Sequence, residues 1–227
     1  MPGTTDPTIP QTLSDYQLIE TIYEGTRTTV YRGQAIATEQ PVVIKVLSPD
    51  NPSFSDLVQF RNQYTITKNL SIPGVISPIA LESYGNGYAL IMADSGGIDL
   101  QKYVDQESLD LKDGLDIAIQ LANILHNLHH NQVIHKDIKP TNILINPVSK
   151  QVQLVDFSIA SLLPKETRVL QSPKGLEGTL AYIAPEQTGR MNRAIDYRTD
   201  FYALGVTLYQ ILSGQLPFTS DDPLELL

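Results

Sequence analysis

The chain has 227 residues, 41% of them hydrophobic, which is enough for one or two globular units with apolar cores. Its formal net charge of −9 argues against a nucleic-acid binder, because such a protein needs a basic face. The absence of cysteine excludes disulfides and thiol chemistry and agrees with a reducing compartment. Residues 1–10 do not read as a signal peptide, and no apolar run reaches the roughly 18 residues of a membrane span. We therefore expect a cytoplasmic protein without membrane insertion.

The N-terminal part of the chain is predicted to form a leader, three strands and a helix. Residues 1–11 are rich in Thr and Pro and are expected to be disordered. β-Branched and aromatic residues dominate positions 16–47, and turn signals at 24–25 and 38–41 divide this stretch into three strands. Apolar residues at helical spacing then predict a helix over 55–70, with Ser55 as its N-cap.

A connector, a hairpin and an amphipathic helix are expected next. Pro and Gly mark residues 71–77 as the connector, and Gly85-Asn86-Gly87 is a strong turn signal between strands at 79–84 and 88–93. The helix over 113–130 carries one apolar stripe, predicted to face a core, formed by Leu115, Ala118, Leu121, Ala122, Leu125 and Leu128. Three histidines near its end lack a partner at metal-ligand spacing, so a structural or exposed role is preferred over a metal site.

Residues 133–156 hold the densest group of chemically active side chains. Two apolar runs, 143–145 and 152–155, flank Asn146-Pro147 and predict a short hairpin. This hairpin could bring together two acids, a cation and an amide, namely Asp137, Asp156, Lys139 and Asn142. Phosphoryl transfer needs such groups, because a hydroxyl must be oriented, magnesium needs oxygen ligands, and developing charge needs a cation.

These motifs closely resemble those of eukaryotic-like Ser/Thr protein kinases. The chain writes His-Lys-Asp-Ile-Lys-Pro at 135–140, followed by Asn142 and then Asp156-Phe157. Val-Val-Ile-Lys at 42–45 and a segment ending in Ala-Pro-Glu at 184–186 also match. The resemblance implies an α+β, bilobal fold: a β-rich N-lobe with one helix over 12–93, and a mainly helical C-lobe over 94–227 that lacks its last helices.

The resemblance also implies roles for individual residues, with ATP and Mg²⁺ as cofactors. Asp137 would accept or orient the substrate hydroxyl, and Lys139 would stabilise the γ-phosphate. Asn142 and Asp156 would hold magnesium, and Lys45 would hold the α and β phosphates. The remaining ATP-site positions are Gly25, Val30, Val43, Gln63, Met92, Ala93, Asp94 and Leu144. His135 would pack beneath Phe157, and Asp200 would accept hydrogen bonds from the catalytic-loop backbone.

Several positions depart from the family pattern and keep a second function open. Gly25 is the only glycine left of the family's G-x-G-x-x-G loop. Gln63 replaces the glutamate that pairs with the strand lysine, so a hydrogen bond remains possible but the charge-assisted part is lost. Lys136 replaces a common arginine, and Ser158 replaces the glycine after Asp156-Phe157. A pseudokinase, acting as a nucleotide-binding or scaffolding module, is therefore the alternative to a Ser/Thr protein kinase, and a small-molecule kinase is a lesser third reading.

The rest of the chain suggests regulation and partners. Residues 161–176 resemble an activation loop, with Thr167 and Ser172 as candidate phosphorylation sites. Thr179 is a third candidate, but it looks more like the family's structural threonine that touches Asp137 and Lys139. Residues 188–198 are similar to the N-terminal kinase-like domain of large bacterial sensor kinases. The expected partners are thus a protein substrate and, further along such proteins, ATPase and histidine-kinase modules or a partner chain. With the last helices missing, Glu186 is expected to be a buried carboxylate without its usual arginine.

Overall fold

A computed structural model describes residues 13, 15–47, 52–107, 109–162, 180–189, 194–220 and 222. The predicted leader at 1–11 and the three candidate phosphorylation sites lie outside these residues. By contacts, the chain divides into two compact units. The first comprises the described residues up to Tyr64 together with Ser77–Asp94, and the second comprises Thr65–Ile76 and the described residues from Ser95 onward. The ranges 12–93 and 94–227 remain a prediction, because units defined by contacts need not be folding domains.

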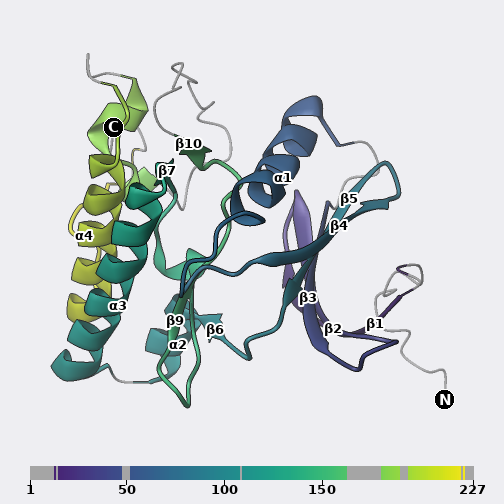
Figure 1. Ribbon diagram of the computed structural model, residues 1–227. Helices are drawn as coiled ribbons and strands as arrows, with labels where there is room; N and C mark the ends of the chain where they lie inside the picture. The colour runs from purple at the N-terminus through teal and green to yellow at the C-terminus, as the bar shows by residue number, and fades with distance from the viewer. Residues whose placement is uncertain are drawn as a thin grey trace. The chain divides into compact units, whose positions relative to one another are not determined.

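The first unit is built on a five-stranded antiparallel sheet, with strand order β1-β2-β3-β5-β4 (Figure 1). The strands are β1 (Tyr16–Glu24), β2 (Thr28–Ala35), β3 (Pro41–Leu47), β4 (Pro78–Tyr84) and β5 (Gly87–Ala93). The three predicted N-terminal strands and the predicted hairpin are therefore confirmed. The β1–β2 turn closes through the Gly25 N–H, which donates to the Thr28 carbonyl at 3.0 Å.

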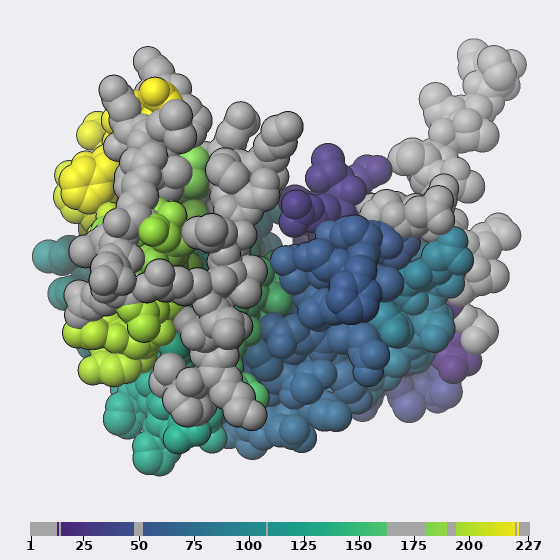
Figure 2. Space-filling view, turned by 90° about the horizontal axis from the view of Figure 1, so that it is seen from above, coloured from purple at the N-terminus to yellow at the C-terminus, as the bar shows by residue number. Residues whose placement is uncertain are grey.

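Side chains alternate between two apolar clusters on the two faces of this sheet. One cluster contains Val42, Ile44 and Val46 of β3 with Ala89 and Ile91 of β5. On the opposite face, Leu47 and Leu90 pack against Phe60 of helix α1 (Phe54–Thr67). In the space-filling view, the blue surface of α1 is continuous with the lighter blue of the β4–β5 hairpin (Figure 2). Lys45 of β3 belongs to the face that α1 covers.

The start of α1 differs from the prediction. The helix begins at Phe54 and is capped by Ser53, so the expected cap at Ser55 is wrong. The Ser53 hydroxyl accepts from the Asp56 N–H at 3.2 Å, and the Asp56 carboxylate accepts from the Ser53 N–H at 3.0 Å. This reciprocal pair satisfies two backbone donors of the first turn. The helix ends at Thr67, three residues earlier than expected.

The second unit combines three helices with short strands, so the expected α+β class is confirmed. The helices are α2 (Leu100–Gln106), α3 (Leu111–His130) and α4 (Arg198–Ser213), and α3 and α4 lie side by side (Figure 1). One small sheet has the order β6 (Ile98–Asp99), β8 (Ile143–Ile145), β9 (Val152–Leu154), and β7 (Val133–Ile134) pairs with β10 (Ser161–Leu162). Three 3₁₀ turns complete it: η1 (Pro140–Asn142), η2 (Leu180–Tyr182) and η3 (Pro185–Thr188).

The buried face of α3 is rotated from the predicted stripe. Leu121, Leu125 and Leu128 are buried as expected, but Leu115 is 50% exposed and Ala122 is also exposed. The face is completed by Gly114, Ile117 and Ile124, which keep the i, i+3, i+7 spacing with Leu121 and Leu128. Within the described part of the chain, no helix is long and apolar enough to cross a membrane.

Candidate active site

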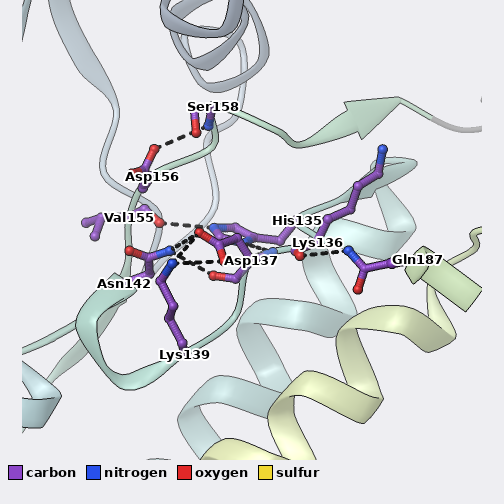
Figure 3. A network of polar contacts seen from close by, with 9 residues as sticks. All are labelled: His135, Lys136, Asp137, Lys139, Asn142, Val155, Asp156, Ser158 and Gln187. Atoms are coloured by element: carbon purple, nitrogen blue, oxygen red, sulfur yellow. Dashed lines mark hydrogen bonds and ion pairs between the residues drawn. The ribbon is translucent and has the colours of Figure 1, made fainter. Parts of the chain in front are cut away.

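The loop between β7 and β8 holds an aspartate whose carboxylate is oriented from two sides. The Lys139 ammonium donates to Asp137 Oδ1 at 3.0 Å and to Oδ2 at 2.8 Å (Figure 3). The Asn142 side-chain amide donates to Asp137 Oδ2 and to the Asp137 backbone carbonyl, both at 2.8 Å. Only 14% of the Asp137 side chain and 18% of that of Lys139 are exposed. Charge-assisted hydrogen bonds in a sheltered loop fix the direction of such a carboxylate.

His135 ties this loop to the end of β9. Its Nδ1 lies 3.2 Å from the Asp137 backbone N–H, and its Nε2 lies 3.0 Å from the Val155 carbonyl. Because the N–H can only donate and the carbonyl can only accept, the ring is neutral and carries its proton on Nε2. The fully buried ring packs edge-on against Phe157, with centroids 4.6 Å apart, as predicted.

Asp156 and Asn142 are joined through the backbone. The Val155 N–H donates to the Asn142 carbonyl at 2.9 Å, which places Asp156 one residue beyond this bond. Asp156 has φ +63°, a left-handed conformation that aspartate tolerates better than most residues. Its Oδ1 lies 3.4 Å from the Ser158 N–H (Figure 3). Ser158 itself has no positive φ, so serine fits the observed conformation there.

Carboxylate and amide oxygens are the ligand types that Mg²⁺ prefers, so Asp156 and Asn142 fit a magnesium ion by their chemistry. In the described ranges, no three His, Cys, Asp or Glu residues gather at a metal site. Magnesium usually completes its shell with water and substrate phosphates rather than in an all-protein cage. These residues therefore suit a metal ion that arrives with a nucleotide.

A buried carboxylate of helix α4 binds the backbone of the loop between β7 and β8. Asp200 is fully buried and accepts from the His135 N–H at 3.0 Å and from the Lys136 N–H at 2.7 Å, as predicted. His129 Nε2 of α3 also lies 2.8 Å from Asp200 Oδ2. The predicted structural role of the histidine cluster thus applies to His129, but its bond to Asp200 was not foreseen. No spacing in the sequence links these two residues, which are 71 positions apart.

The ammonium group of Lys136 is partly buried, which disfavours its charged form. Burial lowers the pKa of its ammonium from 10.5 to about 8, and the negative charge of Asp200 opposes this shift. The Lys136 carbonyl accepts a hydrogen bond from the Gln187 side-chain amide of η3 at 3.1 Å. Sequence reasoning missed Gln187, because its partner is a backbone atom 51 residues away.

Glu186 differs from the expectation of a buried carboxylate without a partner. It is half-buried, and its Oε1 accepts from the Thr199 hydroxyl at 2.8 Å. Thr199 is fully buried in the first turn of α4, so the contact also fixes the helix start. The expectation was wrong because it considered only an arginine as the partner.

The predicted phosphate-binding lysine lies in the first unit with its helix partner. Lys45 and Gln63 are 8% and 4% exposed, and Lys45 Nζ donates to Gln63 Oε1 at 3.1 Å. The expected hydrogen bond between the strand lysine and Gln63 is thus present. Val30 and Leu90 are the direct cross-strand neighbours of Lys45, so the three side chains share one face of the sheet.

Other predicted ATP-site residues surround Lys45 or end the same sheet. Val43 pairs with Met92. Val43 lies two positions before Lys45 on β3, and Met92 lies two positions after Leu90 on β5, so both side chains share the face of Lys45. Ala93 pairs with Val42 at the end of β5. The carboxylate of Asp94 accepts from Arg32 Nε at 2.6 Å, and its N–H donates to the Pro41 carbonyl at 3.2 Å. Its N–H is therefore already used within the first unit.

The predicted residues thus form two groups. The first group lies in the second unit, where Asp137 contacts Lys139 and Asn142. Asp156 belongs to the same group, because the residue before it, Val155, donates its N–H to the Asn142 carbonyl. Leu144 is half-buried on β8, between the buried Ile143 and Ile145. The group around Lys45 belongs to the first unit.

Comparison with known proteins gives consistent matches over most of the chain. Residues 16–226 match the model of the protein kinase domain. The serine/threonine-protein kinase PrkC of Bacillus subtilis is 29% identical over 208 residues, which cover 91% of this chain and 31% of PrkC. PknB of Mycobacterium tuberculosis is 30% identical over 230 residues, covering 95% and 35%, and TIO of Arabidopsis thaliana is 33% identical over 208 residues, covering 91% and 15%. The chain therefore spans about a third or less of the length of these relatives.

Proposed function

Because the chain belongs to the protein kinase family, we propose that it transfers the γ-phosphoryl group of ATP to serine or threonine hydroxyls of a protein substrate. The observation that carries this proposal is the arrangement of Asp137, whose carboxylate is held by Lys139 and Asn142. Such a fixed acceptor suits a reaction in which catalysis consists mainly of positioning and charge stabilisation.

Each residue of the loop has a defined task in this reaction. Asp137 accepts the proton of the attacking hydroxyl while a new P–O bond forms and the bond from the γ-phosphorus to the β–γ bridging oxygen breaks. Lys139 stabilises charge on the γ-phosphoryl oxygens and neutralises Asp137 between turnovers. Asn142 and Asp156 would hold magnesium, which would neutralise charge on the phosphates. Lysine at position 139 favours Ser/Thr over Tyr acceptors by family resemblance.

Lys45 supplies the second cation of the proposed site, on the α and β phosphates. Its hydrogen bond to Gln63 orients the ammonium. We propose that Gly25, Val30, Val43, Met92, Ala93, Asp94 and Leu144 complete the nucleotide site. Residues 92–95 resemble the family's inter-lobe hinge, whose backbone groups bond adenine.

The replacement of an anionic partner by Gln63 favours one alternative, a pseudokinase that binds nucleotide without turnover. Under either reading, the resemblance of residues 188–198 to bacterial sensor kinases makes ATPase and histidine-kinase modules, or a partner chain, the proposed partners.

A phosphoryl-transfer assay separates these two functions. We expect ³²P from γ-labelled ATP to enter a Ser/Thr protein substrate such as myelin basic protein or casein, and Asp137→Asn to reduce this by about 10²–10⁴-fold. A thermal-shift titration with Mg-ATP runs in parallel. Incorporation no higher than in Asp137→Asn, with a thermal shift retained, would replace the kinase by the nucleotide-binding module.

A further inference from the structure

The backbone of Lys136, directly before Asp137, is held in an unfavourable conformation. Its φ is +70°, in the left-handed region that side chains with a Cβ rarely adopt. A residue persists there only when surrounding contacts outweigh the cost, and such positions gather at functional sites. The contacts that hold Lys136 are therefore candidates for a role in the reaction.

Two side chains from distant parts of the chain hold the two ends of this residue. Asp200 Oδ1 accepts from the Lys136 N–H at 2.7 Å, from helix α4. On the other side, Gln187 Nε2 of η3 donates to the Lys136 carbonyl at 3.1 Å (Figure 3). The side-chain Oε1 of Gln187 simultaneously accepts from the Ala184 N–H at 3.0 Å. One half-buried amide thus joins the 184–188 segment to the peptide that leads into Asp137.

This peptide determines where the Asp137 carboxylate points. The Lys136 carbonyl and the Asp137 N–H belong to the same peptide group, and the N–H donates to His135 Nδ1. Fixing the carbonyl through Gln187 therefore fixes the plane from which the Asp137 side chain leaves. Releasing it would let Lys136 relax toward a negative φ and rotate that plane.

We infer that Gln187 is a positioning residue: by holding the Lys136 carbonyl, it keeps Asp137 aligned with the acceptor hydroxyl. The catalytic consequence of this inference rests on the proposed function. The stabilisation of the Lys136 backbone by Gln187 can be measured without turnover.

The substitution Gln187→Glu isolates the contact. A glutamate can still accept from the Ala184 N–H but cannot donate to the Lys136 carbonyl when ionised. It removes one bond of the pair at nearly constant shape. Gln187→Ala removes both bonds and serves as the comparison for the loss of the whole bridge.

The chain contains a matched control in Gln120. This half-buried glutamine accepts from the Val152 N–H at 2.9 Å and donates to the carbonyl of Lys150 at 3.0 Å. Lys150 also has a positive φ, +56°, and lies in the β8–β9 turn, outside the proposed catalytic residues. Gln120→Glu repeats the same chemical change at a left-handed lysine with no assigned catalytic role.

The decisive experiment measures amide hydrogen exchange at Lys136 by ¹⁵N NMR, together with kcat. We expect Gln187→Glu to raise the exchange rate of the Lys136 amide by on the order of tenfold. It should lower kcat by a similar factor with little change in the KM for ATP. Gln120→Glu should change neither kcat nor the exchange rate of the Lys136 amide. In a Lys136→Gly background, glycine adopts the left-handed conformation freely, so Gln187→Glu should change exchange at residue 136 much less.

Exchange at Lys136 that is the same in Gln187→Glu as in the parent protein would overturn the inference, as would an equal change in Gln120→Glu. Faster exchange without any fall in kcat, in a protein that is active, would also contradict the positioning role. If the parent protein does not transfer phosphate above the Asp137→Asn control, the proposed function fails. The exchange measurements still decide whether Gln187 holds the loop.

Discussion

At the residue scale, the candidate site depends on polar side chains that each serve two partners. Asn142 bonds both the side chain and the backbone of Asp137, and His135 bonds one backbone group through each ring nitrogen. Buried polar networks in which every member is satisfied fix a single geometry, and partly satisfied ones are costly. Single substitutions here should therefore have large effects.

The Lys45–Gln63 pair gives a first prediction. Replacing Gln63 with methionine removes the hydrogen bond to a buried ammonium at similar volume, so we expect the free energy of unfolding to fall by about 1–3 kcal/mol. Urea denaturation followed by circular dichroism measures this change. Gln59→Met, one turn earlier on α1, is the matched control and should change stability by less than about 0.5 kcal/mol. Equal losses in the two variants would contradict the argument.

Lys136 predicts a specific pH dependence of stability. Its pKa falls from 10.5 in the unfolded chain to about 8 in the native protein, mainly through burial. Between these values the unfolded state binds more protons than the native state, so the free energy of unfolding should rise with pH. The penalty for burying the charge is fully present below pH 8 and is lost by pH 10.5.

The comparison with Lys136→Met isolates this contribution, because other lysines and tyrosines also titrate in the range. We expect the unfolding free energy of the parent protein to gain on that of the methionine variant as pH rises from 8 to 10.5. Chemical denaturation at half-unit pH intervals provides the curves. A difference between the two proteins that stays constant over this range would show that the lysine is not desolvated.

The residue scale also shows what the sequence could and could not reveal. Asp137, Lys139 and Asn142 lie within six positions, so a local motif is enough to predict that they meet. Gln187 and His129 act on partners 51 and 71 positions away, so their contacts depend on how η3 and α3 pack. Glutamine and histidine in these places carry no local signal of that role.

At the element scale, the periodicity of apolar residues predicted the presence of the helices more accurately than it predicted their buried faces. The predicted α3 stripe included Leu115 and Ala122, which are exposed, and omitted Ile117 and Ile124, which are buried. Both sets have helical spacing, and only the packing against α4 and β9 separates them. The α1 cap failed for a similar reason, since Ser53 and Ser55 are both cap formers and only Ser53 has Asp56 three residues later.

The connector at 71–77 offers a prediction at this scale. Gly74 has φ +85°, and a Cβ added there would lie 2.4 Å from Ile124 Cδ1, a buried side chain of α3. Gly74→Ala combines backbone strain with overpacking, so we expect a loss of about 2–4 kcal/mol in unfolding free energy.

Gly214 provides the control in the same unit. It has φ +73° but open space around the Cβ position, so Gly214→Ala should cost only the strain, about 1–2 kcal/mol. Thermal and urea denaturation of both variants measure the difference. A loss in Gly74→Ala no greater than in Gly214→Ala would mean that Ile124 moves aside without cost.

At the scale of the whole molecule, the α+β order of elements and the family could both be predicted from the sequence. Turn signals placed the strands of the five-stranded sheet, and the kinase motifs recur in order along the chain. That the two groups of residues meet stays a prediction from resemblance, because Lys45 and Asp156 belong to different units. The proposed function requires that residues of both units bind one Mg-ATP.

An ATP analogue with a reactive acyl phosphate tests this claim most directly, because it acylates lysine amines close to its phosphates. Mass spectrometry then identifies the modified lysines. We predict that Lys45, although only 8% exposed, is acylated, that excess Mg-ATP suppresses this, and that Asp156→Asn strongly reduces it. Lys112, whose side chain is 81% exposed, reports non-specific labelling that ATP does not suppress. Acylation of Lys45 that is absent, or unaffected by both Mg-ATP and Asp156→Asn, would contradict a shared nucleotide site.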